Sequence, residues 1–268
     1  MTGPLLPYWT WLDRQRNFGD ALTELFRATL LAPLPDADRG VYFLIGSVLD
    51  DAWVRRGLRL GRERGGPVHF WTCGWRGTPV APDLLDQATV HAVRGPLTRT
   101  GLGLPAGLPI GDAALLLPLL YQPPRTGVRH ACLLVPHFED PQRTAMLARP
   151  QDWGADGAVS PAVRGGADIL AVIDAVARSR LVLCGAMHAA VVALAYGVRF
   201  VFFRDGFLNC PPKWDDLAAA MGCEPVFAAR RSEASAMTDA RSPPLRALLA
   251  ACPLPVRPEV LRRAAALP

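Results

Sequence analysis

The stretch Ser179–Phe203, "SRLVLCGAMHAAVVALAYGVRFVFF", is almost wholly apolar, yet His188 lies in the middle of it. Three interpretations are open: a membrane-spanning helix, a buried strand-helix-strand unit with a structural histidine, or the same unit with the histidine at a functional site. The uncharged run 181–198 is near the lower length limit for a membrane span. Two glycines interrupt this run and arginines flank it closely, so a membrane helix is the least favoured of the three.

Two strand-like runs, 181–183 and 199–203, surround an Ala-rich segment, 186–196, that is typical of a helix. A glycine lies at each end of this helix, where the chain is expected to break. We therefore predict a β-α-β unit. In this unit His188 lies in the first helical turn, at the C-terminal end of a parallel strand. Open α/β sheets bind their ligands at that edge.

Composition limits the classes of function. The chain has 268 residues, of which half are hydrophobic and 20% are charged, enough for one large domain or two of ordinary size. The net charge of +5 is spread along the chain without a basic block, so we expect no nucleic-acid partner. A mild positive field instead favours small anionic substrates or an anionic membrane surface.

The N-terminal residues lack the pattern of a signal peptide, so we expect a cytoplasmic protein with reduced cysteines. The six cysteines have no CxxC or other metal-ligand spacing, and carboxylates do not cluster either, so we expect no metal. Lys213 is the only lysine among many arginines, which makes it conspicuous.

Strand and helix patterns alternate along the chain, which predicts an α/β fold with parallel sheets. The predicted strands are 41–47, 68–74, 89–93, 108–112, 130–137, 181–183 and 199–203, and the predicted helices are 50–64, 94–102, 165–178, 186–196, 211–222, 245–251 and 258–266. The segment 121–129 is rich in Pro, Gly and Arg and reads as a linker. We therefore predict two Rossmann-like domains, 1–125 and 126–268, that face each other across a cleft.

Ligands of such domains bind in the loops that follow the strands. The candidate loops are 17–20, 46–47, 74–75, 94–96, 111–112, 137 and 185–188. Several contain glycines that open helices, and helix N-termini attract anions. The first of these, "NFGD", also reads as an ordinary helix N-cap cluster.

Two of the five histidines stand out. His137 and His188 both follow strands in the second half, whereas His69, His91 and His130 fall within or at the start of strands and are expected to be structural. A histidine exchanges protons near neutral pH. We therefore expect His137 and His188 to share a site.

Several short motifs follow one another along the chain in a definite order. It runs "NFGD", "GSVL", "VRGPLTR", "GDAALLLP", "VPH", "MHAAVVALAYGV" and "KWDDL". This series resembles the polysaccharide pyruvyl transferase family, and in particular the short bacterial enzymes that add pyruvate ketals to xanthan- and succinoglycan-type repeat units. The resemblance covers about residues 17–217. No single motif is specific to the family, but the order of the motifs is.

The resemblance implies a GT-B-like arrangement, with residues 1–125 on the acceptor side and 126–268, including the closing C-terminal helices, on the donor side. It implies phosphoenolpyruvate as donor, a pyruvate ketal on an exopolysaccharide sugar as product, and released phosphate. The acceptor in such enzymes is often lipid-linked, so contact with the inner face of the cytoplasmic membrane is expected. The basic segment 257–268 is an amphipathic helix either for that contact or for packing on the protein.

Two positions depart from the family pattern. Many members have an arginine two residues before the histidine, where this chain has Ala186, and Gly-Asp-Pro where it has Ala113 in third place. The first departure matters more, because that arginine is expected to hold the donor. It indicates either the short ketal-transferase branch or lost activity.

Ketal formation needs an acid, a base and cations. We assign His188 as the acid, His137 as the base, and Asp20 as a group that orients sugar hydroxyls or partners a histidine. The expected donor-binding residues are Arg94 as a bidentate clamp, Lys213 as a second cation unless it pairs with Asp215 or Asp216, and Asn17, Gly19, Gly185 and Asp112. Trp75 or Trp214 is expected to stack on the sugar.

Two other functions stay open. A GT-B-like glycosyltransferase that uses a nucleotide sugar would share the fold and the anion-binding loops. A non-catalytic partner in an export or assembly complex would lack the donor site.

Overall fold

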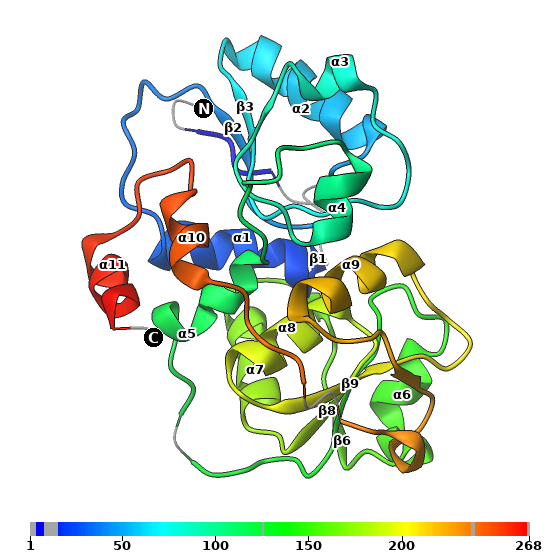
Figure 1. Ribbon diagram of the computed structural model, residues 1–268. Coiled ribbons are helices and arrows are strands. Elements are labelled where there is room, and N and C mark those ends of the chain that lie inside the picture. Colours follow the sequence, from blue (N-terminus) through cyan, green and yellow to red (C-terminus); the bar gives the residue numbers. More distant parts are fainter. Residues whose placement is uncertain (1–3, 8–15, 125, 237–238, 267–268) are drawn as a thin grey trace.

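The computed structural model describes residues 4–7, 16–124, 126–236 and 239–266. It is a mixed α/β structure with parallel sheets (Figure 1). Residue 125, where we placed the boundary between the domains, lies outside the described residues. The predicted α/β class is confirmed.

The first sheet lies in the upper part of Figure 1 and is wholly parallel. Its strands are β2 (Val41–Phe43), β3 (Val68–Phe70) and β4 (Thr89–Val90), in that spatial order. Its helices are α2 (Asp51–Arg64), α3 (Pro82–Leu85) and α4 (Pro96–Gly101). The predicted strands are thus present but shorter, and the predicted strand 108–112 contributes only an isolated bridge at Ile110.

Local chemistry explains the best-defined helix here. The side chain of Asp50 caps α2 by accepting a hydrogen bond from the Trp53 N–H at 2.9 Å. The helix ends at Gly65, whose positive φ of 68° suits glycine.

The second sheet, in the lower part of Figure 1, is also parallel and has the order β10-β9-β8-β5-β6. Its strands are β5 (Leu133–Val135), β6 (Gly157–Ala158), β8 (Leu181–Cys184), β9 (Arg199–Phe203) and β10 (Phe227–Ala228). The helices of this half are α6 (Arg143–Ala148), η2 (Pro150–Trp153), α7 (Gly166–Ala177), α8 (Met187–Ala195), α9 (Pro211–Met221) and η3 (Arg231–Glu233). The β-α-β unit predicted from the opening stretch is confirmed as β8-α8-β9.

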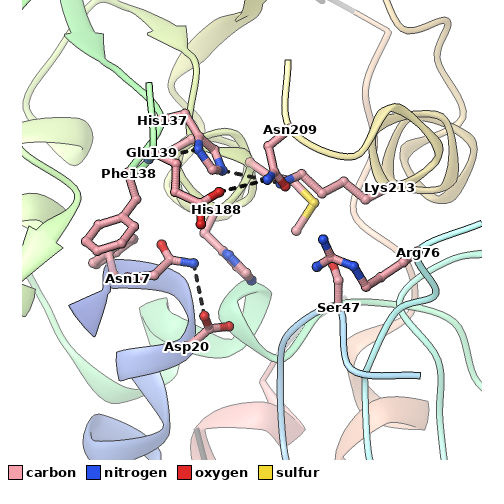
Figure 2. A pocket seen from close by; sticks show the side chains of 13 residues that line it. Asn17, Asp20, Ser47, Arg76, His137, Phe138, Glu139, His188, Asn209 and Lys213 are labelled. Carbon is pink, nitrogen blue, oxygen red and sulfur yellow. Dashed lines mark hydrogen bonds between the residues drawn. The ribbon is translucent and has the colours of Figure 1, made fainter. Parts of the chain in front are cut away.

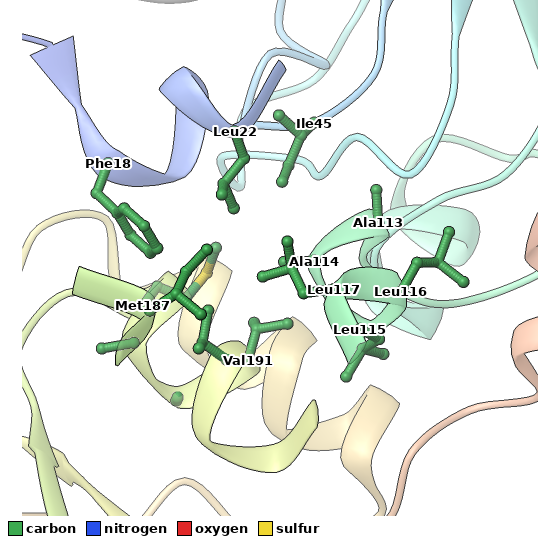
Figure 3. Close-up of a cluster of buried hydrophobic side chains, with 14 of the residues drawn as sticks. Phe18, Leu22, Ile45, Ala113, Ala114, Leu115, Leu116, Leu117, Met187 and Val191 are labelled. Atoms are coloured by element: carbon green, nitrogen blue, oxygen red, sulfur yellow. The ribbon is translucent and has the colours of Figure 1, made fainter. Parts of the chain in front are cut away.

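Early residues of the chain lie against the second half. Strand β1 (Arg16–Asn17) pairs antiparallel with β7 (Ala162–Val163), and α1 (Phe18–Thr29) packs on α7 and α8. Figure 3 shows Phe18 and Leu22 of α1 facing Met187 and Val191 of α8. The largest buried cluster continues from the first sheet through this contact into the second.

The C-terminal helices lie beside this contact in Figure 1. Between the two sheets the chain forms η1 (Ala113–Leu116) and α5 (Leu117–Leu120), and it closes with α10 (Leu245–Ala250) and α11 (Pro258–Ala265). The Trp71 Nε1–H donates to the Leu248 carbonyl at 3.0 Å, and Val260 and Ala264 of α11 are buried. The apolar face of α11 therefore packs on the protein.

Within the described ranges, no helix has the length and apolar character needed to span a bilayer. The membrane-helix interpretation of the opening stretch is wrong, because α8 covers only Met187–Ala195 and strands flank it.

Candidate active site

A cavity of about 80 Å³ opens where the C-terminal ends of β5 and β8 meet the start of α1 (Figure 2). About 10–15 Å³ holds one water molecule, so this volume suits a small ligand. The lining residues come from both halves of the chain and are Asn17, Phe18, Asp20, Ser47, Arg76, His137, Phe138, Glu139, Ala186, Met187, His188, Asn209 and Lys213.

His137 follows β5 and reaches the cavity as a hydrogen-bond donor. The Glu139 backbone N–H donates to His137 Nδ1 at 3.1 Å, so the proton of the neutral ring lies on Nε2. Burial, together with the charges of Lys213 and Arg76, lowers the pKa of His137 from its ordinary 6.5 to about 3. The ring is therefore neutral in the physiological pH range.

Lys213 lies in the first turn of α9, 3.5 Å from His137 Nε2, and donates to Asn209 Oδ1 at 2.9 Å. Burial, aided by the charges of Arg94 and Arg76, lowers its pKa from 10.5 to about 8. Arg76, from the loop after β3, lines the same side of the cavity. We call His137, Lys213 and Arg76 the donor wall, because each presents N–H groups.

Two carboxylates line the cavity: Glu139 lies beside His137, and Asp20 lies below His188 in Figure 2. Asp20, in the first turn of α1, accepts from Asn17 Nδ2 at 3.0 Å. Burial raises the pKa of Asp20 above its ordinary value, although His188, Asn17 and Lys213 act in the other direction. Figure 2 shows His188 next to Asp20.

His188 has a second carboxylate behind it. Its Nε2 lies 3.4 Å from Asp112 Oδ2, and both groups are buried. The other oxygen of Asp112 caps η1 by accepting from the Ala114 N–H at 2.9 Å, which holds the carboxylate in place. We call Asp20 and His188, backed by Asp112, the carboxylate wall. No hydrogen bond joins His188 Nε2 to Asp112 Oδ2, so Asp112 is a close charged neighbour of the His188 ring.

Two glycines make this packing possible. A Cβ added at Gly19 would overlap the imidazole of His188, so only glycine lets α1 approach the ring this closely. A Cβ at Gly185 would lie 3.1 Å from the backbone nitrogen of His137. The N–H groups of Gly185 and Ala186 both donate to the Val135 carbonyl, so neither serves as the anion cradle we expected.

The first N–H groups of a helix have no partner inside it. At the start of α8 these are the N–H groups of Met187 and His188, two residues that line the cavity. They take the place that we assigned to Gly185.

Arg94 is brought near the cavity but not into its lining. Its buried guanidinium donates to Ser47 Oγ at 2.7 Å and to the Trp75 carbonyl at 3.2 Å, and its Nε lies 3.4 Å from Asp216 Oδ2. It therefore holds Ser47, which does line the cavity. The arginine that lines the cavity is Arg76, whose Nε lies 3.8 Å from Asp50 Oδ2.

Trp75 and Trp214 do not line the cavity. Trp214 is fully buried against Phe202 and Phe227, so it is a core residue and not a platform for a sugar. Trp75 lies over Gly101, where a Cβ would meet its ring.

Four lining residues were missed by our sequence prediction: Arg76, Phe138, Glu139 and Asn209. Arg76 comes directly after the candidate loop 74–75, and Asn209 lies four residues before Lys213. Asn209 Nδ2 donates to Glu139 Oε2 at 2.9 Å across the rim. Of the missed residues, Arg76 could have been found from the sequence, because it directly follows the candidate loop 74–75.

Among the residues that the structure describes, no three His, Cys, Asp or Glu side chains are placed to hold a metal ion. Comparison of the chain with models of protein families, with curated proteins and with solved structures finds no match.

Proposed function

We propose that this protein is a pyruvyl transferase that moves the pyruvate of phosphoenolpyruvate onto a sugar of an exopolysaccharide repeat unit as a ketal, with release of phosphate. One observation carries the proposal: the N–H groups and cations of the donor wall and the groups of the carboxylate wall line one small cavity. The ordered motifs give it a family context.

Phosphoenolpyruvate carries a phosphate and a carboxylate, and the donor wall matches both. The Nε2–H of His137, the ammonium of Lys213 and the guanidinium of Arg76 donate to anionic oxygens, and charge-assisted hydrogen bonds of this kind are strong. The N-terminus of α8 adds backbone N–H groups and a partial positive charge.

Ala186 stands where many family members have an arginine. It lies at the cavity at the start of α8, beside Met187. Arg76 and Lys213 bring cations to the same cavity from other segments. We therefore assign the role of the missing arginine to these two residues, which favours branch identity over lost activity.

The carboxylate wall would supply the proton transfers. In the reaction C3 of phosphoenolpyruvate gains a proton, two sugar oxygens bond to C2, and the C2–O bond to phosphate breaks. One of the two hydroxyl protons accounts for the proton that C3 gains when it becomes a methyl group. The other leaves with the phosphate. We assign His188, which has the Asp112 carboxylate 3.4 Å away, as the acid toward C3, and Asp20, whose pKa is raised, as the base toward a sugar hydroxyl.

His137 has a different assignment from the one expected from sequence. Its Nδ1 is occupied by the Glu139 N–H, and its pKa of about 3 disfavours uptake of a proton. We assign it as a ligand of the donor's anionic groups and not as the base.

The proposed function also includes an arrangement of the two domains and a place in the cell. We infer that the two parallel sheets form two Rossmann-like, GT-B-like domains, since lining residues come from before residue 77 and after residue 136. The expected acceptor is a sugar on a lipid-linked oligosaccharide at the inner face of the cytoplasmic membrane.

Calorimetric titration with phosphoenolpyruvate, beside a UDP-sugar, tests the function. We expect phosphoenolpyruvate to bind, and Lys213→Met to weaken binding roughly 10- to 100-fold, because a hydrogen bond to a charged group contributes about 1.5–3 kcal/mol. Arg199→Met is the matched control, since it removes one exposed cation at the opposite end of β9. Binding of the UDP-sugar without phosphoenolpyruvate would instead indicate a glycosyltransferase.

A further inference from the structure

A buried polar cluster joins α9 to α4, behind the donor wall. Asp216 on α9 accepts two hydrogen bonds from Thr98, from its backbone N–H at 2.9 Å and from its hydroxyl at 2.6 Å. Arg94 Nε lies 3.4 Å from the same carboxylate. All three residues are at most 1% exposed. We call Asp216, Arg94 and Thr98 the Asp216 cluster.

The carboxylate acts as an N-cap supplied by another helix. Thr98 is in the first turn of α4, whose own N-cap residue is Gly95, which has no side chain to cap it. Glycine is needed there for a second reason, because a Cβ at Gly95 would overlap Asp216. A Cβ at Gly74 would likewise overlap the guanidinium of Arg94. The surrounding backbone is thus shaped around this ion pair.

The cluster also joins the parts of the donor wall. Lys213 precedes Asp216 by three residues on α9, which is about one helical turn. Arg94 holds Ser47 of the cavity lining at 2.7 Å. Near the loop of Arg76, Cys210 Sγ contacts the Arg76 carbonyl at 3.5 Å. Lys213 arrives from one half of the chain and Ser47 and Arg76 from the other, so their spacing depends on this contact.

We propose that Asp216 is a positioning residue that fixes the spacing between Lys213 on α9 and the Arg76 and Ser47 loops, and so sets the affinity of the cavity for its anionic ligand. Asp216 does not itself line the cavity. The identity of that ligand as phosphoenolpyruvate rests on the proposed function; the positioning role does not.

The chain offers a matched pair of variants for the test. Asp216→Asn removes the buried charge, and Asp215→Asn removes the same charge from the neighbouring, exposed residue of the same helix. In the full-length protein we expect Asp216→Asn to raise the Kd for phosphoenolpyruvate at least 10-fold, and Asp215→Asn to change it less than twofold.

A second pair of variants removes less of the cluster, so the test still works if Asp216→Asn does not fold. Thr98→Val removes the hydroxyl that bonds Asp216, whereas Thr98→Ser keeps it. We expect Thr98→Val to weaken phosphoenolpyruvate binding about 10-fold and Thr98→Ser to restore affinity to within about threefold of the native value. Thr98→Val keeps the methyl group and loses only the hydroxyl, so an equal loss of affinity in Thr98→Ser would show that the hydroxyl bond to Asp216 is not responsible.

Hydrogen exchange gives a readout without any ligand. Pro211 and Pro212 have no amide hydrogen, so the readout is the amides of residues 213–217 of α9. We expect them to exchange at least 10-fold faster in Asp216→Asn and Thr98→Val than in their controls. If the native protein binds no phosphoenolpyruvate, the proposed function fails while this exchange comparison still decides the positioning role. Unchanged exchange, or faster exchange with native phosphoenolpyruvate affinity, would overturn that role.

Discussion

His137 and His188 lie at the ends of neighbouring strands and line one cavity, yet their surroundings are opposite. His137 has the cations Lys213 and Arg76 around it, and a backbone N–H occupies its Nδ1. His188 lies beside Asp20 and 3.4 Å from the carboxylate of Asp112. The difference teaches that the neighbours, and not the residue type, set the electrostatic surroundings of each ring. In the proposed function this separates ligand binding from proton transfer. Changes on the two walls should therefore affect different constants.

The largest effect is expected on the carboxylate wall. His188→Gln should lower kcat roughly 10²- to 10⁴-fold, because it removes a general acid, with the Kd for phosphoenolpyruvate changed less than threefold. Phosphate release with a repeat-unit acceptor measures kcat, and calorimetry measures Kd. His130→Gln, at the far end of β5, is the control. Near-native kcat in a folded His188→Gln protein would remove His188 from the mechanism.

A smaller effect tests the geometry of the same wall. Gly19→Ala should displace the imidazole of His188, because the added Cβ would overlap it. A misplacement of about 1 Å can cost about 10²-fold in rate, so we expect a loss of that order in kcat. Gly166→Ala, at the first position of α7 with open space around it, is the matched control. Equal kcat in both variants would show that the close approach of α1 is not needed.

The donor wall should respond to pH through Lys213. Its pKa of about 8 means that the free protein loses this charge as pH rises above 8. We expect the affinity for phosphoenolpyruvate to fall as pH rises through 8, by at most about tenfold per pH unit for one proton. Lys213→Arg keeps the charge and should flatten this part of the profile. A profile that stays the same in Lys213→Arg would assign the titration to another group.

The smallest effect concerns stability in acid. His137 stays neutral in the folded protein down to about pH 3, whereas in the unfolded chain it takes up a proton below about pH 6.5. Stability is therefore lost as pH falls through this window. Between pH 7.5 and 5.5 we expect His137 to account for a loss of about 1 kcal/mol in the free energy of unfolding. Urea denaturation of the native protein and of His137→Asn at both pH values measures it; an equal loss in both proteins would contradict it.

The positions of both histidines were predictable from sequence, for a definite reason. Apolar runs that end in glycine mark strand ends, and the C-terminal ends of parallel strands meet at one edge of a sheet. This argument places His137 and His188 near each other, whereas Asp112 follows a strand of the first half and is expected near them only because the two domains are predicted to face each other across a cleft. It also predicted α2, α7, α8 and α9 to within a few residues.

Arg94 shows where such reasoning fails. Arg94 and Arg76 both follow strands of the first sheet, and their local patterns do not differ in a way that predicts exposure. They differ in their partners. Arg94 Nε lies 3.4 Å from the carboxylate of Asp216, a residue of the other half, and Arg94 does not line the cavity. Pairings as distant in sequence as Thr98 with Asp216, or β1 with β7, follow from tertiary packing and leave no periodic trace.

The single lysine has a practical consequence for handling the protein. Reagents that couple to amines, such as activated esters on sensor surfaces, find only Lys213 and the α-amino group of the chain. Because Lys213 has an unusually low pKa, its unprotonated, nucleophilic form is well populated at the mildly alkaline pH of such couplings. Lys213 is only 7% exposed, so small amine reagents that enter the cavity would label it there, whereas a surface would couple through the α-amino group. A tag or a thiol label elsewhere would leave every copy able to bind.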